Sequence, residues 1–452
     1  MKTRWGATAV ALALGSTGGM FAGGALAQSV TAPTNIEIYG HLDLSIDDAT
    51  KGIAGHLDGN GAPLQGKLGW QPDISSNLSR LGIRGGHDLG ENGLRAVFQI
   101  ETQVDVSATP GTASSNSSAD NNVKGAFASR NSFLGLAGGF GAAKLGKTDA
   151  PYKLSTSRMD PFSATVGDYN SIMGNSGGDN RAEFDTRLSH AAWYESPKLG
   201  AFSFSALFAP GQNRSSDNSI QPSGEPDCAG GNNPDSNLGC TDGSFGNVYS
   251  IAGVYNAGPL YAIAAYERHK NVNRTGDEDG TIVMPGQVGI ADESAGKLGV
   301  QYRLAATTIN AIYERLTRKA PVAEFNERQR NGYWLALTQK LSPEDDVNLG
   351  WGHAGKTPGS PAAAHLPDGT PNAGSLDNAS NLYSLGYKHH FEDKRTTWYL
   401  VYARQANHNA AHFDLGASGH GITTDCHDGA IDATCSTGGT VQAISLGMTY
   451  DF

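Results

Sequence analysis

The sequence predicts an all-β fold, a transmembrane antiparallel up-and-down β-barrel of about 16 strands. Three observations predict this fold class. Apolar and polar residues alternate with a period of two in segment after segment, which is typical of strands with one apolar face. The breaks between these segments alternate between short turns and long polar loops. No apolar run beyond the N-terminal segment approaches the roughly 18 residues of a membrane-spanning helix.

The N-terminal segment, residues 1–27, is predicted to be a secretory signal peptide. Lys2 and Arg4 form a positive start, residues 7–14 form a short apolar core, and Ala25-Leu26-Ala27 is a small-residue cleavage pattern. The apolar core is too short for a membrane helix. The barrel domain is then expected to occupy residues 28–452, outside the cytoplasm.

The predicted strands follow in order along the chain. In the first, residues 36–47, Ile36, Ile38 and Leu42 share one face, while Glu37 and Asp43 share the other. A hairpin over 131–147, around Gly138–Gly141, supplies two strands. The full set of predicted strands is 36–47, 79–89, 94–105, 131–138, 141–147, 188–196, 202–209, 248–256, 260–269, 295–304, 308–318, 331–339, 346–353, 381–390, 396–407 and 441–452.

The connections between these strands fall into two classes that alternate, as in a barrel with a turn side and a loop side. The predicted short turns are 90–93, 138–141, 197–201, 257–259, 305–307, 341–345 and 392–395. The predicted long loops are 49–78, 105–129, 148–187, 210–247, 270–294, 319–330, 354–380 and 408–440.

A soluble β-sandwich is the alternative, since its strands also alternate, but its connections do not alternate so regularly in length. Charged side chains on the polar faces fit a wet lumen, and a closed barrel leaves no unpaired strand edge. The last strand must pair with the first to close the barrel. Six aromatic residues near strand ends are expected to form girdles at the membrane interfaces: Trp193, Tyr194, Tyr313, Trp334, Trp351 and Trp398.

Four cysteines lie in two polar stretches, Cys228 with Cys240 and Cys426 with Cys435. In an exported protein an even number suggests disulfides, and local pairing within each stretch is the simplest of three connectivities. Zinc binding is the alternative because His427 adjoins Cys426, but the spacing of structural zinc sites is missing. No metal site and no cofactor are expected.

Four further features of the sequence bear on nucleotide binding, metal binding, catalysis and nucleic-acid binding. Residues 141–148, GAAKLGKT, match the phosphate-binding loop pattern, but they alternate like a strand and no helix is expected after them. The last long loop carries His408, His412, His420 and several aspartates, and is predicted to be a solvated surface loop rather than a metal site. No serine nucleophile elbow between a strand and a helix and no compelling Ser–His pairing is recognised, so the chain is not expected to be an enzyme. A net charge of −11 argues against nucleic acid as a partner.

Several segments resemble the general porins of Gram-negative outer membranes, in particular the trimeric diffusion porins of the β-proteobacterial and neisserial type. The resemblance covers residues 35–452. It is carried by IEIYGHLD, SRLGIRGGHDLGENGLRAVFQIE at 79–101, NSFLGLAGGFGAAKLGK at 131–147, MDPFSATVGDYN at 159–170, AAWYESPKLGAFSFSALF at 191–208, and the terminal LGMTYDF. The chain departs from the family at Gly146-Lys147-Thr148, at 194–197, and in the long cysteine-containing loop.

The resemblance implies a homotrimer that lets small hydrophilic solutes and ions diffuse passively across the outer membrane. It also implies that the third external loop, about 148–187, narrows the lumen, and that Phe452 is read by the outer-membrane assembly machinery. Lipid and lipopolysaccharide are the expected surroundings. Opposed charges would then line the constriction: Arg80, Arg84, Arg95 and Lys144 on the wall, and Asp149, Asp160, Asp168 and Asp179 on the loop.

Two matters stay open at the level of sequence. The loop aspartates could be simple solvated acids, and the sign of ion selectivity does not follow, since wall bases and loop acids nearly balance. A substrate-selective outer-membrane channel is the alternative function, and an adhesive surface protein is a third class.

Overall fold

A computed structural model of the chain describes residues 34–52, 67–90, 92–107, 127–174, 184–210, 246–273, 290–318, 329–357, 377–408, 411, 413–417, 420 and 440–452. The predicted signal peptide, the four cysteines, Asp179, His412 and His427 lie outside these residues.

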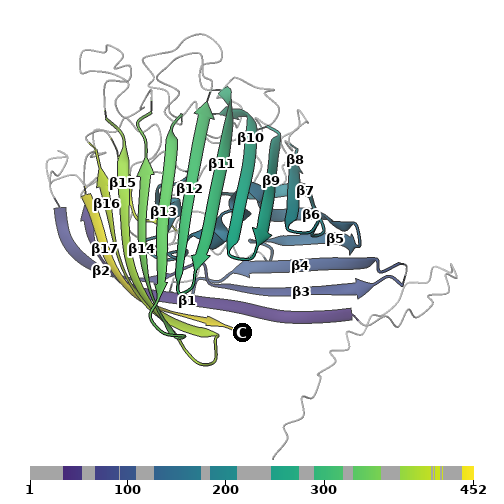
Figure 1. Cartoon of the computed structure of the whole chain (residues 1–452), viewed down its shortest axis with the longest axis horizontal. Coiled ribbons are helices and arrows are strands. Elements are labelled where there is room, and N and C mark those ends of the chain that lie inside the picture. The colour runs from purple at the N-terminus through teal and green to yellow at the C-terminus, as the bar shows by residue number, and fades with distance from the viewer. Residues whose placement is uncertain are drawn as a thin grey trace, which may run out of the picture.

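The described residues form one closed antiparallel barrel (Figure 1). Apart from β2 and β3, which both pair with β1, each strand pairs with its neighbours along the chain, and β17 pairs with β1. The strands are β1 (Thr34–Gly52), β2 (Lys67–Ser76), β3 (Arg80–Asp88), β4 (Arg95–Gln103), β5 (Ser132–Gly138), β6 (Gly141–Asp149), β7 (Arg187–Glu195), β8 (Phe202–Ala209), β9 (Val248–Ala257), β10 (Leu260–Asn273), β11 (Ile290–Leu304), β12 (Thr307–Arg318), β13 (Asn331–Lys340), β14 (Asp345–Ala354), β15 (Ser380–His390), β16 (Thr396–Asn407) and β17 (Thr440–Asp451).

The 17 labelled segments make a barrel of 16 strands, because β2 and β3 are successive halves of one. The long β1 pairs with β3 through residues 34–41 and with β2 through residues 44–52. The interruption lies at Asn77 to Ser79, where Leu78 has a positive φ of 56°. The prediction of a long loop over 49–78 was therefore wrong in part. Pro72 and a polar composition concealed the strand, since proline is depleted in strands.

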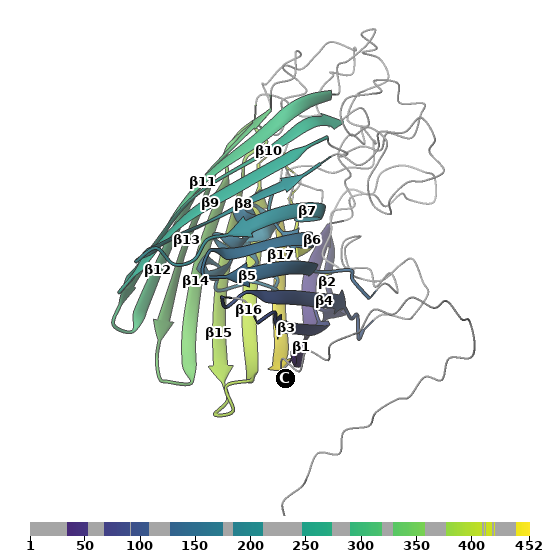
Figure 2. The ribbon, with the colours of Figure 1, turned by 90° about the vertical axis from the view of Figure 1, so that its right-hand side faces the viewer.

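All seven predicted short turns are confirmed as hairpin connections between consecutive strands. Four of these turns join β9 to β10, β11 to β12, β13 to β14 and β15 to β16, and they lie at the same end of the barrel in Figure 1. In the turn after β3, Gly90 and Gly93 both have a φ of 74°, a region that glycine enters without steric cost. Figure 2, turned by 90°, shows the wall that β3 to β8 form.

The burial pattern is the inverse of that in a soluble protein. Large apolar side chains point outward along every wall; Ile38 is 66% exposed and Leu298 is 57% exposed. Polar side chains on the alternate positions point inward, and Asp43, Ser45 and Asp47 are buried. This arrangement matches a barrel whose outer surface meets lipid and whose lumen is polar. Among the helices of the described residues, none combines the length and apolar character needed to cross a membrane.

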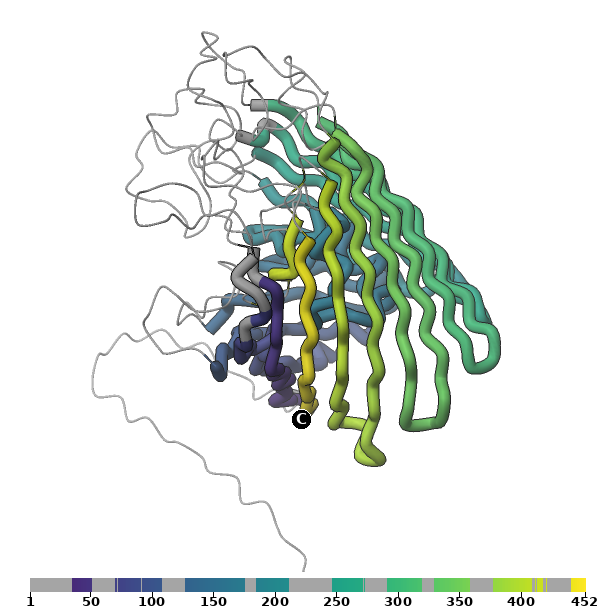
Figure 3. The backbone as a smooth tube through the Cα atoms, turned by 90° about the vertical axis from the view of Figure 1, so that its left-hand side faces the viewer, coloured from purple at the N-terminus to yellow at the C-terminus, as the bar shows by residue number. Residues whose placement is uncertain are grey.

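The C-terminal strand closes the barrel, as the alternation of residues 444–452 predicts. Strand β17 pairs with β1 from His41–Asp451 to Ala49–Ala443, and the tube in Figure 3 places the C-terminal end beside β1. Phe452 itself joins this closure. Its backbone N–H and C=O each bond Gly40 at 3.1 Å, and its ring lies where any β-carbon on Gly40 would stand.

The predicted aromatic girdle is corrected at two positions. Trp334 is fully buried inside the barrel and Trp193 is almost so, whereas Trp351 lies on the outward face of β14 with Leu349. Strand β13 turns Trp334 inward because Tyr333 and Leu335, its neighbours in the strand, take the outward positions.

Candidate pore constriction

The connection between β6 and β7 folds into the barrel. Its described part, residues 150–174 and 184–186, contains α1 (Pro151–Leu154), η2 (Ser157–Met159) and η3 (Tyr169–Ser171). Pro151 suits the first turn of α1 because proline lacks the N–H that would be unsatisfied there. The Asp168 side chain caps η3 by accepting from the Asn170 N–H. We call this segment the constriction loop.

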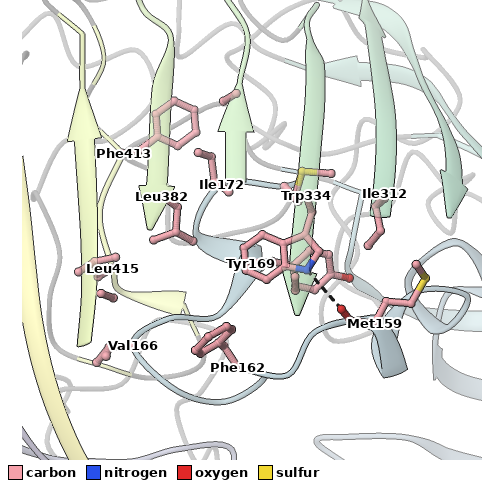
Figure 4. Close-up of a cluster of buried hydrophobic side chains, with 14 of the residues drawn as sticks. Met159, Phe162, Val166, Tyr169, Ile172, Ile312, Trp334, Leu382, Phe413 and Leu415 are labelled. Atoms are coloured by element: carbon pink, nitrogen blue, oxygen red, sulfur yellow. Dashed lines mark hydrogen bonds between the residues drawn. The ribbon is translucent and has the colours of Figure 1, made fainter. Parts of the chain in front are cut away.

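One apolar cluster seats the constriction loop against the inner wall (Figure 4). Trp334 of β13 lies at its centre, with ring centroids 6.2 Å from Phe162 and 5.9 Å from Tyr169. Its indole N–H donates to the Met159 carbonyl at 3.3 Å. Burial of three aromatic rings away from the water of the lumen favours this position of the loop.

Hydrogen bonds from the wall fix the backbone of the loop along its length. Tyr261 donates to the Ser155 carbonyl at 2.8 Å, and Ser384 donates to the Gly167 carbonyl at 3.0 Å. Arg330 donates to the Ile172 carbonyl at 2.8 Å. These donors come from β10, β15 and the residue before β13, so the loop is attached to the β10–β15 side of the lumen.

A buried ion pair fixes the far end of the loop. Lys297 of β11 donates to both carboxylate oxygens of Asp185, at 2.6 and 2.9 Å. Glu314 of β12 lies 3.9 Å from the same ammonium group, and the side chains of all three residues are inaccessible to solvent. Glu314 accepts from the Tyr152 hydroxyl at 2.7 Å and from the Gly174 N–H at 2.7 Å. Burial raises the pKa of Asp185 to about 6, although the Lys297 charge opposes the shift.

The structure places Asp160 and Asp168 inside the loop rather than on its surface. Both are buried. Asp160 accepts from the N–H groups of Phe162 and Tyr169 at 2.9 and 3.1 Å. Asp168 accepts from the N–H groups of Ala164 and Asn170 at 2.9 and 2.8 Å. Burial, with the nearby Asp168 charge, raises the pKa of Asp160 well above its usual range.

Asp149 lies where β6 passes into the loop, and it is buried among bases. Arg187 and Lys153 approach its carboxylate at 3.2 Å each, and Asn131 donates to it at 2.9 Å. The cross-strand pairing of Asp149 with Arg187 brings these opposite charges together. The carboxylate is thus neutralised by two cations.

Arg80 and Arg84 lie on the inward face of β3, on the wall opposite the anchored side of the loop. Arg80 stands 3.8 Å from Glu101, a carboxylate that Arg130 also binds at 2.8 Å. Arg84 forms a two-pronged pair with Glu37 at 2.8 and 2.9 Å, and half of its side chain remains exposed. Both arginines therefore keep part of their surface toward the lumen.

The other two predicted bases lie apart from this group. Lys144 stands over the Phe133 ring and binds Glu195 at 2.7 Å, within an apolar cluster around Trp193. Arg95 begins β4, directly after the short turn, and its cross-strand partner is Asp88. Arg95 therefore lies at the turn end of the barrel.

Sequence reasoning missed the bases of the loop itself. Lys153 is part-exposed and Arg158 is exposed, with its guanidinium 4.3 Å from the Tyr261 ring centroid. No period-2 pattern marks them, because the loop is not a strand. Arg130 and Arg187 could have been found, since each adjoins a predicted strand and pairs with an acid of the strand before it, Glu101 and Asp149 respectively.

The phosphate-loop match and the histidine-rich last loop can now be compared with the structure. Residues 141–149 form β6, so the phosphate-loop match is a strand as predicted, although the short α1 does follow it. His420 and Asp414 are buried, which contradicts the prediction of a solvated loop for these two residues. Within the described ranges, no group of His, Cys, Asp and Glu has the arrangement of a metal site.

Comparisons with known proteins agree with this geometry. The family model of the Gram-negative porins matches residues 7–410. The chain is 33% identical over 143 residues to the major outer membrane protein P.IA of Neisseria meningitidis serogroup A, a match that covers 32% of this chain and 31% of that protein. The chain thus spans about a third of the length of this curated relative.

Among solved structures, the anion-selective porin from Comamonas acidovorans superimposes with a TM-score of 0.61 at 20% identity, over 93% of this chain and 100% of that one. The trimer form of OmpT from Vibrio cholerae gives 0.51 at 14% identity, over 93% and 99%. These likenesses show the barrel fold. Since the family match extends over most of its length, the chain belongs to the Gram-negative porins, the β-barrel proteins of the outer membrane.

Proposed function

We propose that the barrel is a water-filled channel for the passive diffusion of small hydrophilic solutes and ions, with a preference for anions. One observation carries the preference for anions. On the described residues of the constriction loop, the charges with access to water are the bases Lys153 and Arg158, while Asp160, Asp168 and Asp185 are buried.

The wall facing the loop adds one more accessible base. The Arg80 side chain remains partly exposed, whereas Glu101 is buried between Arg80 and Arg130, and Arg84 is paired with the exposed Glu37. Cations on both sides of a narrow passage lower the energy of an anion and raise that of a cation there. Passage itself needs no covalent step, because the solute only exchanges bulk water for a polar lumen.

The relatives support both parts of this proposal. The family is that of the porins, and one structure with the same fold is described as an anion-selective porin. We further propose a homotrimer, in keeping with the trimer form of OmpT. Phe452 is proposed as the residue that the outer-membrane assembly machinery reads, and lipopolysaccharide as a neighbour of the long loops.

Bilayer recording of the purified protein under a KCl gradient tests the proposal. We expect the conductance to rise in steps as channels insert, and the zero-current potential to have the sign that indicates a higher permeability to chloride than to potassium. The double variant Lys153→Glu, Arg158→Glu should move that potential toward cation selectivity. Arg95→Glu is the matched control: it makes the same charge change at the turn end of the barrel, so a smaller shift is expected.

Three results would contradict the proposal. Folded protein that gives no insertion events would refute the channel. A cation-selective wild type would refute the preference for anions. Small conductance that one class of solute blocks at low concentration would favour a substrate-selective channel instead.

A further inference from the structure

Described residues of the last long connection, between β16 and β17, also lie inside the barrel. Four of its described residues, Ala411, Phe413, Leu415 and His420, are between 0% and 2% exposed. Hydrogen bonds between Asn407 and the backbone of Phe413, at 2.8 and 3.1 Å, turn the chain back where β16 ends. A loop standing in external water would leave such side chains accessible.

The apolar side chains of this connection pack on the constriction loop. Phe413 and Leu415 belong to the same buried cluster as Val166 and Ile172 (Figure 4). Arg330 joins the two segments: it donates to the Ile172 carbonyl at 2.8 Å, and its guanidinium carbon lies 5.1 Å from the Phe413 ring centroid. The connection therefore rests on the constriction loop inside the lumen.

His420 ties the same connection to the first strand. Its Nδ1 lies 2.6 Å from Oδ2 of Asp47 on β1, and its Nε2 lies 3.4 Å from the Ala164 carbonyl of the constriction loop. The side chains of His420 and Asp47 are both inaccessible. Asp47 also accepts from Ser75 of β2 at 2.8 Å. One imidazole thus joins the constriction loop to the β1 wall.

We propose that the described part of this connection, residues 411, 413–417 and 420, is a second constriction element. It lies on the constriction loop and limits the size of the solutes that pass, and His420 holds it in place as a latch. The proposal rests on the proposed function, since a size limit has meaning only in an open channel. It differs from that function in assigning the limit to two inserted segments rather than one.

The charged groups around the latch predict how it responds to pH. Asp47 and Asp43 of β1 face His420, and Asp73 of β2 lies across from Asp47. Further away, Lys388 of β15 lies near Asp43 and Asp160. Ser445 of β17 is the cross-strand neighbour of Asp47 and a neutral group.

Burial lowers the pKa of His420, but the Asp47 charge and hydrogen bond, with Asp43 and the Ala164 carbonyl, raise it above its ordinary value. A raised histidine pKa means that the protonated latch is intact below the ordinary value and weakens as pH rises through the higher one. The latch is therefore expected to weaken at pH values above the ordinary histidine pKa.

The test measures single-channel conductance and the exclusion size for neutral polyethylene glycols at pH 6 and pH 9. In the wild type we expect both to rise at the higher pH. In His420→Gln, conductance and exclusion size should no longer depend on pH and should equal the high wild-type values of pH 9. In His420→Arg they should also be independent of pH but equal the low wild-type values of pH 6. Phe413→Ser weakens the packing rather than the latch, and it should show high conductance and a large exclusion size at both pH values.

His408→Gln is the matched control, since His408 pairs with Asp377 at the surface and should leave the wild-type response intact. Circular dichroism and heat-shifted electrophoretic mobility establish that each variant has folded. Wild-type conductance, exclusion size and pH response in the folded Phe413→Ser and His420 variants would overturn the inference. A wild type that forms no channel would refute the proposed function instead.

Discussion

At the scale of single residues, the charged side chains of the constriction loop have two roles: some hold the fold of the loop, and others face the water of the lumen. The carboxylates of Asp160 and Asp168 each accept two backbone N–H groups, so they hold the tight turns of the loop. Lys153 and Arg158 have access to water and can act on a passing ion. Composition alone counts these residues together and so predicts a nearly balanced constriction.

The first prediction separates these roles through Asp160→Asn. An asparagine has one acceptor oxygen, so one of the two N–H groups loses its partner, and we expect a stability loss of about 1–3 kcal/mol. The zero-current potential under a salt gradient should stay close to that of the wild type, because the buried carboxylate has a raised pKa and little contact with the lumen.

Lys153→Gln gives the comparison, since it removes one charge from an accessible position and should reduce the preference for anions. Denaturant unfolding in detergent measures the stability change of both variants. A shift of the potential in Asp160→Asn as large as in Lys153→Gln would show that Asp160 acts on the ion directly.

At the scale of elements, the inserted loop owes its position to the wall behind it. Strand β13 presents Trp334 to Phe162 and Tyr169, and β11 presents Lys297 to Asp185. The glycines of β14 make room for this contact: a β-carbon on Gly350 would stand 2.6 Å from the Trp334 ring. Small residues on one strand therefore allow a large one on the next to carry the loop.

The second prediction is that Trp334→Ala loosens the constriction loop. Removing a fully buried tryptophan leaves a cavity and costs on the order of 3–5 kcal/mol. We expect a larger and noisier open-channel current, since the loop loses the centre of its apolar cluster. Single-channel recording measures the current and its variance.

Trp351→Ala is the matched control on the adjacent strand β14, where the side chain lies on the outward face. It removes the same atoms without touching the loop, so the current should keep its wild-type noise. Equal effects of the two substitutions would argue that Trp334 does not position the loop.

At the scale of the whole molecule, the barrel turns its apolar residues outward and its polar residues inward. The third prediction uses two outward positions of β11, Leu298 within the strand and Leu304 at its turn end. Arginine near the middle of the lipid layer costs about 2–4 kcal/mol, and near its edge about 0–1 kcal/mol. We expect Leu298→Arg to destabilise the barrel more than Leu304→Arg.

Reversible unfolding from lipid vesicles measures the free energy of unfolding of both variants. The two positions lie on the same face of the same strand and carry the same substitution, so they differ only in depth. Similar losses at the two positions would contradict the depth assigned to β11. Stabilisation by arginine at Leu298 would contradict a lipid-facing wall altogether.

The strands, the short turns and the direction of most side chains could be predicted from the amino-acid sequence alone. Alternation is a local property: in residues 444–452 each side chain faces opposite to its neighbour whatever lies across the barrel. Turn residues such as Gly90 and Gly93 act over a few positions. The one strand segment missed, β2, contains Pro72 and a kink at Leu78, so its local pattern was weak.

Which charges remain at the constriction, and which segments fill the lumen, depends on contacts between residues far apart in the chain. The loop acids are buried by turns that no period-2 pattern describes. The inward position of Trp334 is equally absent from that pattern, because its partners, Phe162 and Tyr169, lie far away in the chain. His420 meets Asp47 across 373 positions. Contacts of this kind follow from barrel closure and loop insertion, which bring distant residues together and leave no trace in local periodicity.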